Sequence, residues 1–203
     1  RFVNEDKWEN DFARVGIAQR NQNKTYAVFC KGDLDAWENE GVYGTCFSFV
    51  AAGEPMAGFT EAVEALDSVH KADTIEELAE AVELDPEALK AVVDQYNSYC
   101  AAGEDPDFNK APEKMHAIEE GPFYIAEIAD GYYCTVGGAK IDTDCEVIDT
   151  EGEVIPGLYA TGCDAGGLYG DAYDVNKAPG SQSSWACNSG RFAAQAAAKY
   201  LGK

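Results

Sequence analysis

The sequence predicts an α+β fold in two parts. The first part is expected to be largely helical, because residues 61–120 hold 17 of the 37 acidic residues and show apolar side chains at helical spacing. From residue 122 onward, aromatic residues, glycines and short β-strand patterns replace these charged helices. An alanine-rich segment from about Ser181 to Leu201 predicts a final helix, whose small side chains favour close packing against a sheet.

Three elements are predicted in the first part. Thr25–Cys30 (TYAVFC) is expected to be a strand. The capping box Thr74-x-x-Glu77 predicts a helix over residues 74–82. Asp85-Pro86 predicts the start of another helix, because a carboxylate caps the first turn and proline is tolerated there. That helix should end near Gly103, and its apolar stripe comprises Leu89, Val92, Val93, Tyr96 and Tyr99. The acids of both helices are expected on solvated faces.

The second part is predicted to contain short strands and the final helix. Phe123–Ile128 alternates like a strand. Residues 147–149 and 153–155 flank a short turn at 150–152, which predicts a hairpin. Leu158–Thr161 is expected to form a further short apolar strand that leads directly into Gly162.

Composition excludes several classes of function. A formal net charge of −22 argues against nucleic acid or an anionic membrane as the main partner, since both require a basic face. No run of about 20 apolar residues is present, so no membrane-spanning segment is expected. The seven cysteines are scattered without a Cys-x-x-Cys pair and the two histidines are far apart, which argues against a disulfide scaffold and against a metal site.

The segment 155–191 is the most informative for chemistry. It combines a predicted strand, a glycine-rich loop and the start of a helix near Gly180-Ser181. Glycines at 162, 166, 167 and 170 allow the backbone to turn sharply and to approach a ligand. The first turn of a helix offers unpaired N–H groups to an anion or an electron-rich ring edge. An ordinary strand-to-helix connection would give the same pattern.

The order of motifs resembles the fumarate reductase/succinate dehydrogenase type of FAD flavoprotein. That family includes fumarate reductases, urocanate reductase and 3-ketosteroid dehydrogenases. The similarity covers nearly the whole chain. The matching segments are residues 1–5 (RFVNE), 84–87 (LDPE), 96–97 (YN), 105–108 (DPDF), 121–124 (GPFY), 135–142 (TVGGAKID), 157–162 (GLYATG), 166–167 (GG) and 189–191 (SGR).

The resemblance implies that the chain is a fragment. The first half of that family carries the Gly-x-Gly-x-x-Gly dinucleotide-binding motif, which this sequence lacks. Residues 1–131 then correspond to a substrate-covering cap (clamp) domain that is incomplete at its start. Residues 132–203 correspond to the C-terminal part of the FAD-binding domain. The implied fold is a helical cap domain with a small sheet, plus the C-terminal lobe of a Rossmann-like domain.

FAD is the only cofactor that the resemblance implies. Gly162 and Cys163 stand where the family usually has Gly-Glu, whose glutamate binds the ribityl chain, and Asp164 is the candidate to replace that acceptor. The matching helix start, whose N–H groups face the pyrimidine edge of the flavin in the family, comprises Gly180, Ser181, Gln182 and Ser183. Such a helix end would stabilise the negative charge of reduced flavin. Plain N-capping by Ser181–Ser184 is the alternative, and it is compatible with this role.

The substrate side departs from the fumarate-reducing pattern. Fumarate reductases have His-His-Thr where this chain has Tyr133-Cys134-Thr135. A substrate-binding arginine of the family aligns with Lys177, and a proton-donating arginine aligns with about Glu9. Lysine cannot clamp a carboxylate with two parallel hydrogen bonds. Fumarate itself is therefore not the expected substrate.

Four residues remain near the flavin face implied by the resemblance. Tyr133 is the first candidate for proton donation to, or hydrogen bonding with, the substrate. Tyr173 is a further catalytic candidate, and Lys177 could anchor an anion or be a solvent-exposed loop lysine. A packing or edge-stacking role is expected for Tyr169. Buried packing is expected for Cys134.

The resemblance therefore implies part of an FAD-dependent oxidoreductase that transfers hydride between flavin and an activated C=C bond of a small substrate, such as an enoate or enone. The implied partners are the missing N-terminal lobe and an unidentified electron donor. Two alternatives remain: a desaturase resembling 3-ketosteroid dehydrogenase, or, for the isolated piece, a non-catalytic domain without flavin. The chain starts with Arg-Phe and shows no signal sequence, as expected of a processed precursor or of a piece of a longer protein. The compartment is left unknown by the sequence, with the cytoplasm favoured and an exported parent as the alternative.

Overall fold

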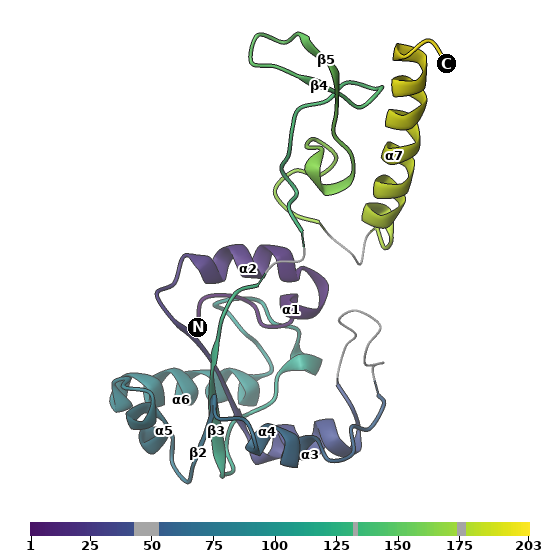
Figure 1. Ribbon diagram of the computed structural model, residues 1–203. Helices are drawn as coiled ribbons and strands as arrows, with labels where there is room; N and C mark the ends of the chain where they lie inside the picture. The colour runs from purple at the N-terminus through teal and green to yellow at the C-terminus, as the bar shows by residue number, and fades with distance from the viewer. Residues whose placement is uncertain (43–52, 132–133, 174–177) are drawn as a thin grey trace. The chain divides into compact units, whose positions relative to one another are not determined.

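A computed structural model describes residues 1–42, 53–131, 134–173 and 178–203. The chain divides into two compact units, Arg1–Asp130 and Gly131–Lys203. Helices and small antiparallel sheets make up both units, as the α+β prediction requires (Figure 1).

A three-stranded antiparallel sheet organises the first unit. Its strands are β1 (Thr25–Cys30), β2 (Val69–Ala72) and β3 (Phe123–Ile128), in the order β1-β3-β2. The central strand β3 is the last in the chain, and it pairs with β1 from Thr25↔Ile128 to Cys30↔Phe123. The predicted strands 25–30 and 123–128 are confirmed, whereas β2 was not predicted.

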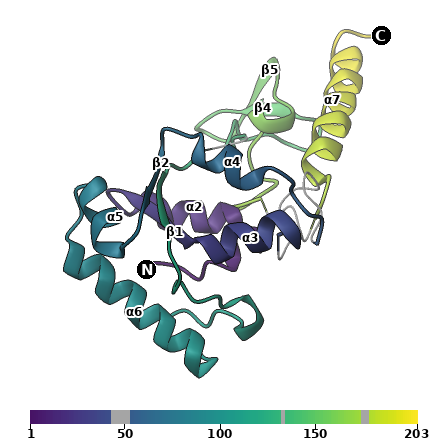
Figure 2. The same cartoon turned by 90° about the horizontal axis from the view of Figure 1, so that it is seen from below.

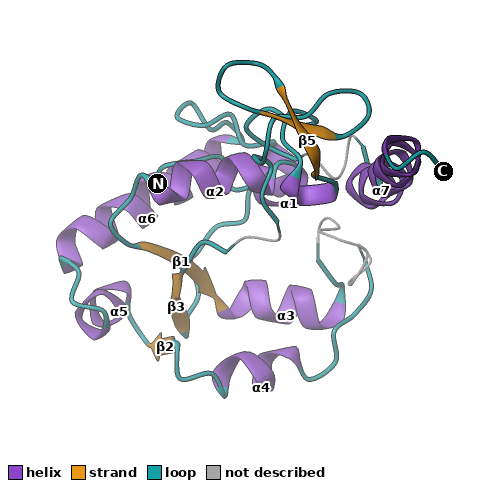
Figure 3. Ribbon diagram, turned by 45° about the horizontal axis from the view of Figure 1, so that its top comes forward, coloured by secondary structure: helices purple, strands orange, loops and turns teal. Residues whose placement is uncertain are grey.

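Helices cover both faces of this sheet (Figure 3). On one face, α5 (Ile75–Ala81) and α6 (Pro86–Ala102) contribute to a buried apolar cluster of Ile75, Leu78, Val93 and Ile125. On the other face, Phe29 stacks on Tyr124 with ring centroids 5.3 Å apart and also contacts Trp37. Neighbouring residues of a strand point to opposite faces, so Tyr124 and Ile125 belong to the two different layers.

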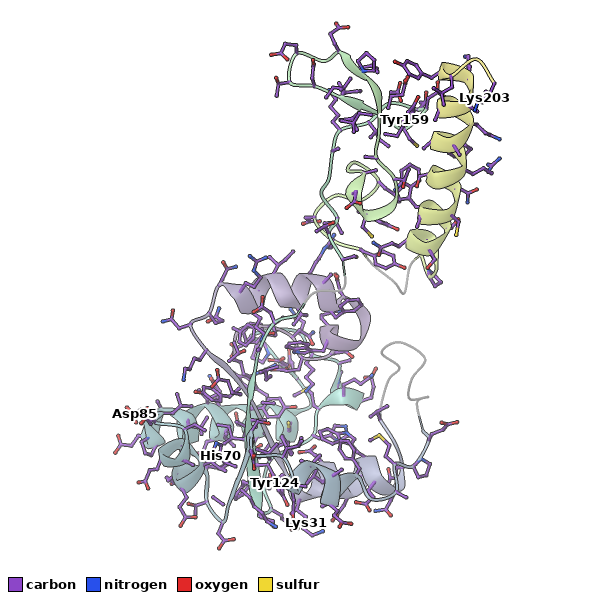
Figure 4. All side chains as sticks on the ribbon, in the orientation of Figure 1. Lys31, His70, Asp85, Tyr124, Tyr159 and Lys203 are labelled. Atoms are coloured by element: carbon purple, nitrogen blue, oxygen red, sulfur yellow. The ribbon has the colours of Figure 1, made fainter. Side chains whose placement is uncertain are left out.

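The second face carries two helices that the sequence analysis did not predict. They are α3 (Lys31–Asn39) and α4 (Phe59–Glu64), and Figure 2 shows them on the side of the sheet away from α5 and α6. The Tyr124 hydroxyl donates a hydrogen bond to Glu64 at 2.7 Å, and Figure 4 labels Tyr124 in the sheet. The unit also contains α1 (Lys7–Asn10), α2 (Phe12–Arg20) and a 3₁₀ turn, η1 (Pro112–Lys114).

The predicted boundaries of α5 and α6 are confirmed. Thr74 accepts a hydrogen bond from the Glu77 amide, and the Glu77 carboxylate accepts one from the Thr74 amide, so the capping box is complete. Asp85 caps α6 through the amides of Glu87 and Ala88, and Gly103 ends the helix with a left-handed φ of 68°. Along the predicted stripe of α6, Val93 and Tyr96 are buried, whereas Val92 is 38% exposed.

The second unit combines a short hairpin with a long helix. Its elements are β4 (Glu146–Ile148), β5 (Val154–Tyr159), the 3₁₀ turn η2 (Gly162–Asp164) and α7 (Ser181–Tyr200). The predicted hairpin and final helix are confirmed. Figure 1 shows α7 beside the hairpin and the η2 turn.

One strand prediction is wrong. Residues 154–155 and 158–159 do not belong to separate strands, because β5 continues through Pro156 and Gly157, and Ala160 and Thr161 lie outside it. Gly157 adopts a φ of 80°, so glycine allows the strand to bend instead of ending. β5 has β4 as its only partner strand in the described sheet, and proline is tolerated on such an edge.

Candidate functional site

The N-terminus of α7 is capped by backbone geometry. Gly180 is the N-cap residue, with a φ of 75°, and no side chain caps the helix. The proposed N-capping by the serine side chains of residues 181–184 is therefore wrong, because glycine already reverses the chain direction. In the part of the chain that the structure describes, the amides of Gln182 and Ser183 have no hydrogen-bond acceptor. The first amides of a helix have no partner within the helix, so they are the donors that a ligand can use.

A buried serine attaches η2 to α7. The Ser189 hydroxyl accepts a hydrogen bond from the Gly162 amide at 2.9 Å and donates one to the Trp185 carbonyl at 2.7 Å. The Trp185 indole N–H donates to the Gly162 carbonyl at 3.1 Å. Ser189 is fully buried, so these bonds fix the backbone of Gly162 against the second and third turns of the helix.

Gln182 brings two cysteines together. Its Nε2 lies 2.8 Å from Cys163 Sγ, and its Oε1 lies 3.1 Å from Cys134 Sγ. The Thr135 hydroxyl donates to the Cys163 carbonyl at 2.8 Å. Cys134 is half-buried and hydrogen-bonded, so it does more than fill buried space as the sequence analysis expected.

Asp164 takes part in this region through its backbone. Its carbonyl accepts a hydrogen bond from the Ala139 amide at 2.8 Å, whereas the residue itself is exposed. Ser183 is exposed as well. Of the predicted cofactor-binding residues, the structure therefore joins Gly162, Cys163 and Gln182 most closely.

Two backbones cross at glycines just beside Asp164. A Cβ on Gly138 would overlap the Asp164 carbonyl and lie 2.8 Å from the Gly166 amide nitrogen. A Cβ on Gly166 would lie 2.9 Å from the Gly138 carbonyl oxygen. Both glycines occur in the recognised motifs, but only the tertiary structure shows that they lie against each other. The neighbouring residues Ala139 and Ala165 form a parallel β-bridge beside them.

Tyr169 contacts the first residue of α7, and Tyr173 contacts Tyr169. The Tyr169 hydroxyl and the Ser181 hydroxyl are 2.9 Å apart. The rings of Tyr169 and Tyr173 are tilted by 46°, with centroids 5.0 Å apart. The packing role expected for Tyr169 is confirmed, and Tyr173 joins the same cluster. Tyr133 and Lys177 lie outside the described residues, as does the side chain of Glu9.

A separate, partly buried charge cluster lies in the first unit. Arg1 donates two hydrogen bonds to Asp105, at 3.0 and 2.8 Å, and two to Glu5. Its guanidinium carbon also lies 4.9 Å from the ring centroids of Tyr96 and Phe108. The hydrogen bonds from Arg1 lower the pKa of Asp105 to about 2. The motif residues 1–5 and 105–108 thus meet in space and stabilise this unit.

Two surface depressions in the described part of the chain do not coincide with the predicted residues. One, of about 300 Å³, lies between α2, the start of β1 and the end of β3. Another, of about 390 Å³, is lined by Asp144, Glu146 and the C-terminal half of α7. Because both are open and shallow, we base the candidate site on the hydrogen-bonded cluster at the start of α7.

The described residues contain no group of three or more His, Cys, Asp or Glu that could hold a metal ion. Among the same residues, no helix is long and apolar enough to cross a membrane.

Comparison with known proteins identifies the family of this chain. The family model described as FAD binding domain matches residues 1–176. Vinyl phenol reductase of Lactiplantibacillus plantarum is 37% identical over 98% of this chain, and urocanate reductase of Eggerthella lenta is 40% identical over 82%. The chain spans 41% and 25% of the lengths of these two relatives.

Solved structures support the same fold. A flavocytochrome c3 fumarate reductase matches 92% of the chain with a TM-score of 0.60 and 25% identity, and the chain covers 29% of it. The 3-ketosteroid Δ1-dehydrogenase of Sterolibacterium denitrificans matches 98% with a TM-score of 0.73, and the chain covers 37% of it. At 22% identity, the second match concerns the fold alone. By its motifs, its fold and its family match, this chain belongs to the FAD-binding flavoproteins of the fumarate reductase type.

Proposed function

We propose that this chain is part of an FAD-dependent oxidoreductase that transfers hydride between flavin and an activated C=C bond. One observation carries the proposal: the start of α7 presents two amides that have no acceptor among the described residues, beside the Gly162–Cys163 backbone that Ser189 fixes. The named activities of the relatives, vinyl phenol reductase and urocanate reductase, support reduction of a small unsaturated substrate.

The two units have different roles in this proposal. Residues 1–131 form the cap domain that covers the substrate, and residues 132–203 form the C-terminal part of the FAD-binding domain. The first unit has helices on both faces of its sheet and a buried apolar cluster, which suit a domain that packs as a unit. The second unit depends on further polypeptide, as its apolar surface indicates.

The described residues fit a flavin. The amides of Gln182 and Ser183, which have no acceptor in the part of the chain that the structure describes, suit the carbonyl oxygens of a flavin ring. No described atom would contact a Cβ at Gly180 within 4 Å. FAD, when bound, supplies the hydride chemistry. The chain's own contribution is to hold Gly162 and the helix start in fixed positions. Cys163 and Asp164 are the candidates for contact with the ribityl chain, and Ser181 completes the helix start.

The apolar surface of the second unit indicates the missing lobe. Few apolar side chains of this unit are buried: Cys145, Ala165 and Ala193. Its exposed large apolar side chains, each at least 37% exposed, are Val154, Ile155, Leu158, Leu168, Phe192, Tyr200 and Leu201. Such exposure marks a surface that another polypeptide covers. We assign it to the N-terminal lobe of the same flavoprotein, since the chain spans 41% of its vinyl phenol reductase relative.

The substrate-side roles follow from chemistry. A tyrosine hydroxyl can donate a proton to the carbon next to the one that receives hydride, and Tyr133 and Tyr173 are the candidates. Lys177 is the candidate anchor for an anionic substrate group. Electrons for reduction come from an unidentified donor. A steroid-type desaturase has less support, because the similarity to the steroid dehydrogenase is a similarity of fold.

Recombination of the two parts of the parent protein tests this proposal. We would mix this chain with the separately produced N-terminal remainder and FAD, remove free FAD, and record the flavin absorbance near ~450 nm. The recombined protein should retain flavin and reduce vinyl phenols or acrylate-type acids from a chemical electron donor. The chain alone is expected to be inactive.

Matched variants make this experiment specific. Leu158→Asp should abolish recombination, because Leu158 is 47% exposed on β5. Leu66→Asp should not, because Leu66 is 53% exposed in the first unit. Recombined protein without retained flavin, or with flavin but without activity on any unsaturated acid, phenol or enone, would contradict the proposal.

A further inference from the structure

The sulfur atoms of Cys134 and Cys163 lie on either side of one side-chain amide. Cys134 Sγ donates to Gln182 Oε1 at 3.1 Å, and Gln182 Nε2 donates to Cys163 Sγ at 2.8 Å. The two polar atoms of a primary amide are about 2.3 Å apart, so the two sulfurs are separated by about 8 Å at most. A single χ1 change moves a cysteine sulfur by about 3 Å. A disulfide requires Cβ atoms about 3.5–4.5 Å apart, so its formation combines rotation of both side chains with a shift of the short segments that carry them, once Gln182 withdraws.

Hydrogen bonds that do not involve Gln182 hold together the two segments that carry the cysteines. The Thr135 hydroxyl, one residue beyond Cys134, donates to the carbonyl of Cys163 at 2.8 Å. Further along the same two segments, Ala139 and Ala165 form a parallel bridge, with hydrogen bonds of 2.8 and 2.9 Å. Because these bonds do not involve the Gln182 side chain, the segments remain together when that side chain moves.

The other described cysteines of the second unit lack this arrangement. Cys145 is buried, its thiol donates to the Ser189 carbonyl at 3.6 Å, and burial raises its pKa. Cys187 is exposed on α7, with no hydrogen-bonded cysteine neighbour among the described residues. Cys134 and Cys163 are both half-buried, so a small oxidant can reach them while the surrounding structure limits their motion.

We propose that Cys134 and Cys163 form a reversible disulfide that displaces the side chain of Gln182. The reaction is thiol–disulfide exchange with a small-molecule disulfide such as oxidised glutathione. Two S–H bonds are lost and one S–S bond forms, and the two electrons and two protons reduce one oxidised glutathione to two glutathione molecules. The disulfide is a redox switch at the start of α7, because Gln182 loses both of its sulfur partners there. Any effect of the switch on FAD rests on the proposed function, whereas the disulfide itself does not.

Intact-mass measurement of this chain tests the proposal. After equilibration with oxidised and reduced glutathione, the wild-type mass should fall by about 2 Da, and dithiothreitol should restore it. Peptide mapping should recover a cross-linked pair containing Cys134 and Cys163. Cys134→Ser and Cys163→Ser should each abolish the mass loss, whereas Cys187→Ser should keep it. Because the readout needs no flavin, its failure is distinguishable from failure of the proposed function.

A second measurement covers the case in which a serine variant does not fold. Wild-type chain is oxidised and its remaining thiols are alkylated, and the disulfide is then reduced and labelled with a second reagent. The second label should appear on Cys134 and Cys163 together. Mixed disulfides with glutathione on these residues, their complete labelling by the first reagent, or a disulfide that joins either to another cysteine would overturn the proposal.

Discussion

Gly137 and Gly138 are neighbours in the sequence, but they meet different surroundings. A Cβ on Gly138 would overlap the Asp164 carbonyl, whereas no described atom lies within 4 Å of a Cβ on Gly137. Gly138 therefore permits the crossing of two backbones that positions Asp164 and, one residue earlier, Cys163. The Gly-Gly motif is visible in the sequence, but the sequence does not show which of the two positions requires a glycine.

Alanine substitutions distinguish these two glycines. Gly138→Ala should destabilise the second unit by about 3 kcal/mol, because the new methyl group meets backbone atoms that cannot give way. Gly137→Ala should change its stability by less than about 0.5 kcal/mol. Amide hydrogen exchange across α7 measures both effects. Equal protection of α7 in the two variants would show that the crossing does not constrain the unit.

The Arg1–Asp105 ion pair predicts a pH dependence. The hydrogen bonds from Arg1 lower the pKa of Asp105 from 3.8 to about 2 in the folded state. The carboxylate therefore stabilises the fold fully above the unfolded pKa, and this contribution is lost as the pH falls from about 4 to about 2. Asp105→Asn should reduce the free energy of unfolding at pH 7 by about 2 kcal/mol, because Arg1 loses a paired acceptor.

Urea denaturation followed by circular dichroism, repeated between pH 7 and 2, measures this dependence. Asp105→Asn should flatten the pH profile below pH 4. Glu104→Gln is the matched control, since Glu104 is an exposed acid next to it in the chain, and it should keep the wild-type slope. An unchanged slope in Asp105→Asn would assign the acid sensitivity to other carboxylates.

At the scale of elements, local signals determined the boundaries of α5 and α6. Thr74, Asp85 and Gly103 act within three or four residues of their own positions, so their roles can be inferred without tertiary contacts. The start of α3 has a capping box in which the Asp33 carboxylate accepts from the Cys30 amide, but cysteine is not one of the usual N-cap residues. The start of α4 is capped by Glu38, which lies about twenty residues earlier in the chain. Both helices lie on an aromatic layer assembled from β1 and β3. The predicted break within β5 failed because Pro156 and Gly157 are turn signals that an edge strand tolerates.

The cap of α6 offers a test at this scale. Asp85→Ala should reduce stability by about 1 kcal/mol, because the amides of Glu87 and Ala88 lose their acceptor. Asp94→Ala should cost about 0.3 kcal/mol, since Asp94 makes an exposed i, i+4 pair with Lys90. Urea denaturation monitored by circular dichroism compares the two. A larger loss in Asp94→Ala would contradict the assigned capping role.

At the scale of the whole molecule, the two units differ in how much surface they bury. The first unit covers both faces of its sheet, whereas the second leaves large apolar side chains of β5 and α7 exposed. The charge of −22 is consistent with this division, because the exposed acids concentrate on the helices of the first unit. This exposure is the basis on which a covering lobe is proposed for the second unit.

The sequence by itself determined the α+β class, the family, and the local helix and strand signals at Thr74, Asp85, Thr25–Cys30 and Phe123–Ile128. These features depend on short-range spacing or on the order of motifs. Only the tertiary structure decided that Gln182 joins Cys134 to Cys163, that Ser189 fixes Gly162 and that Gly138 must lack a side chain. Each of these contacts joins segments far apart in the chain, and the pattern along one segment carries no information about which distant atoms it will meet.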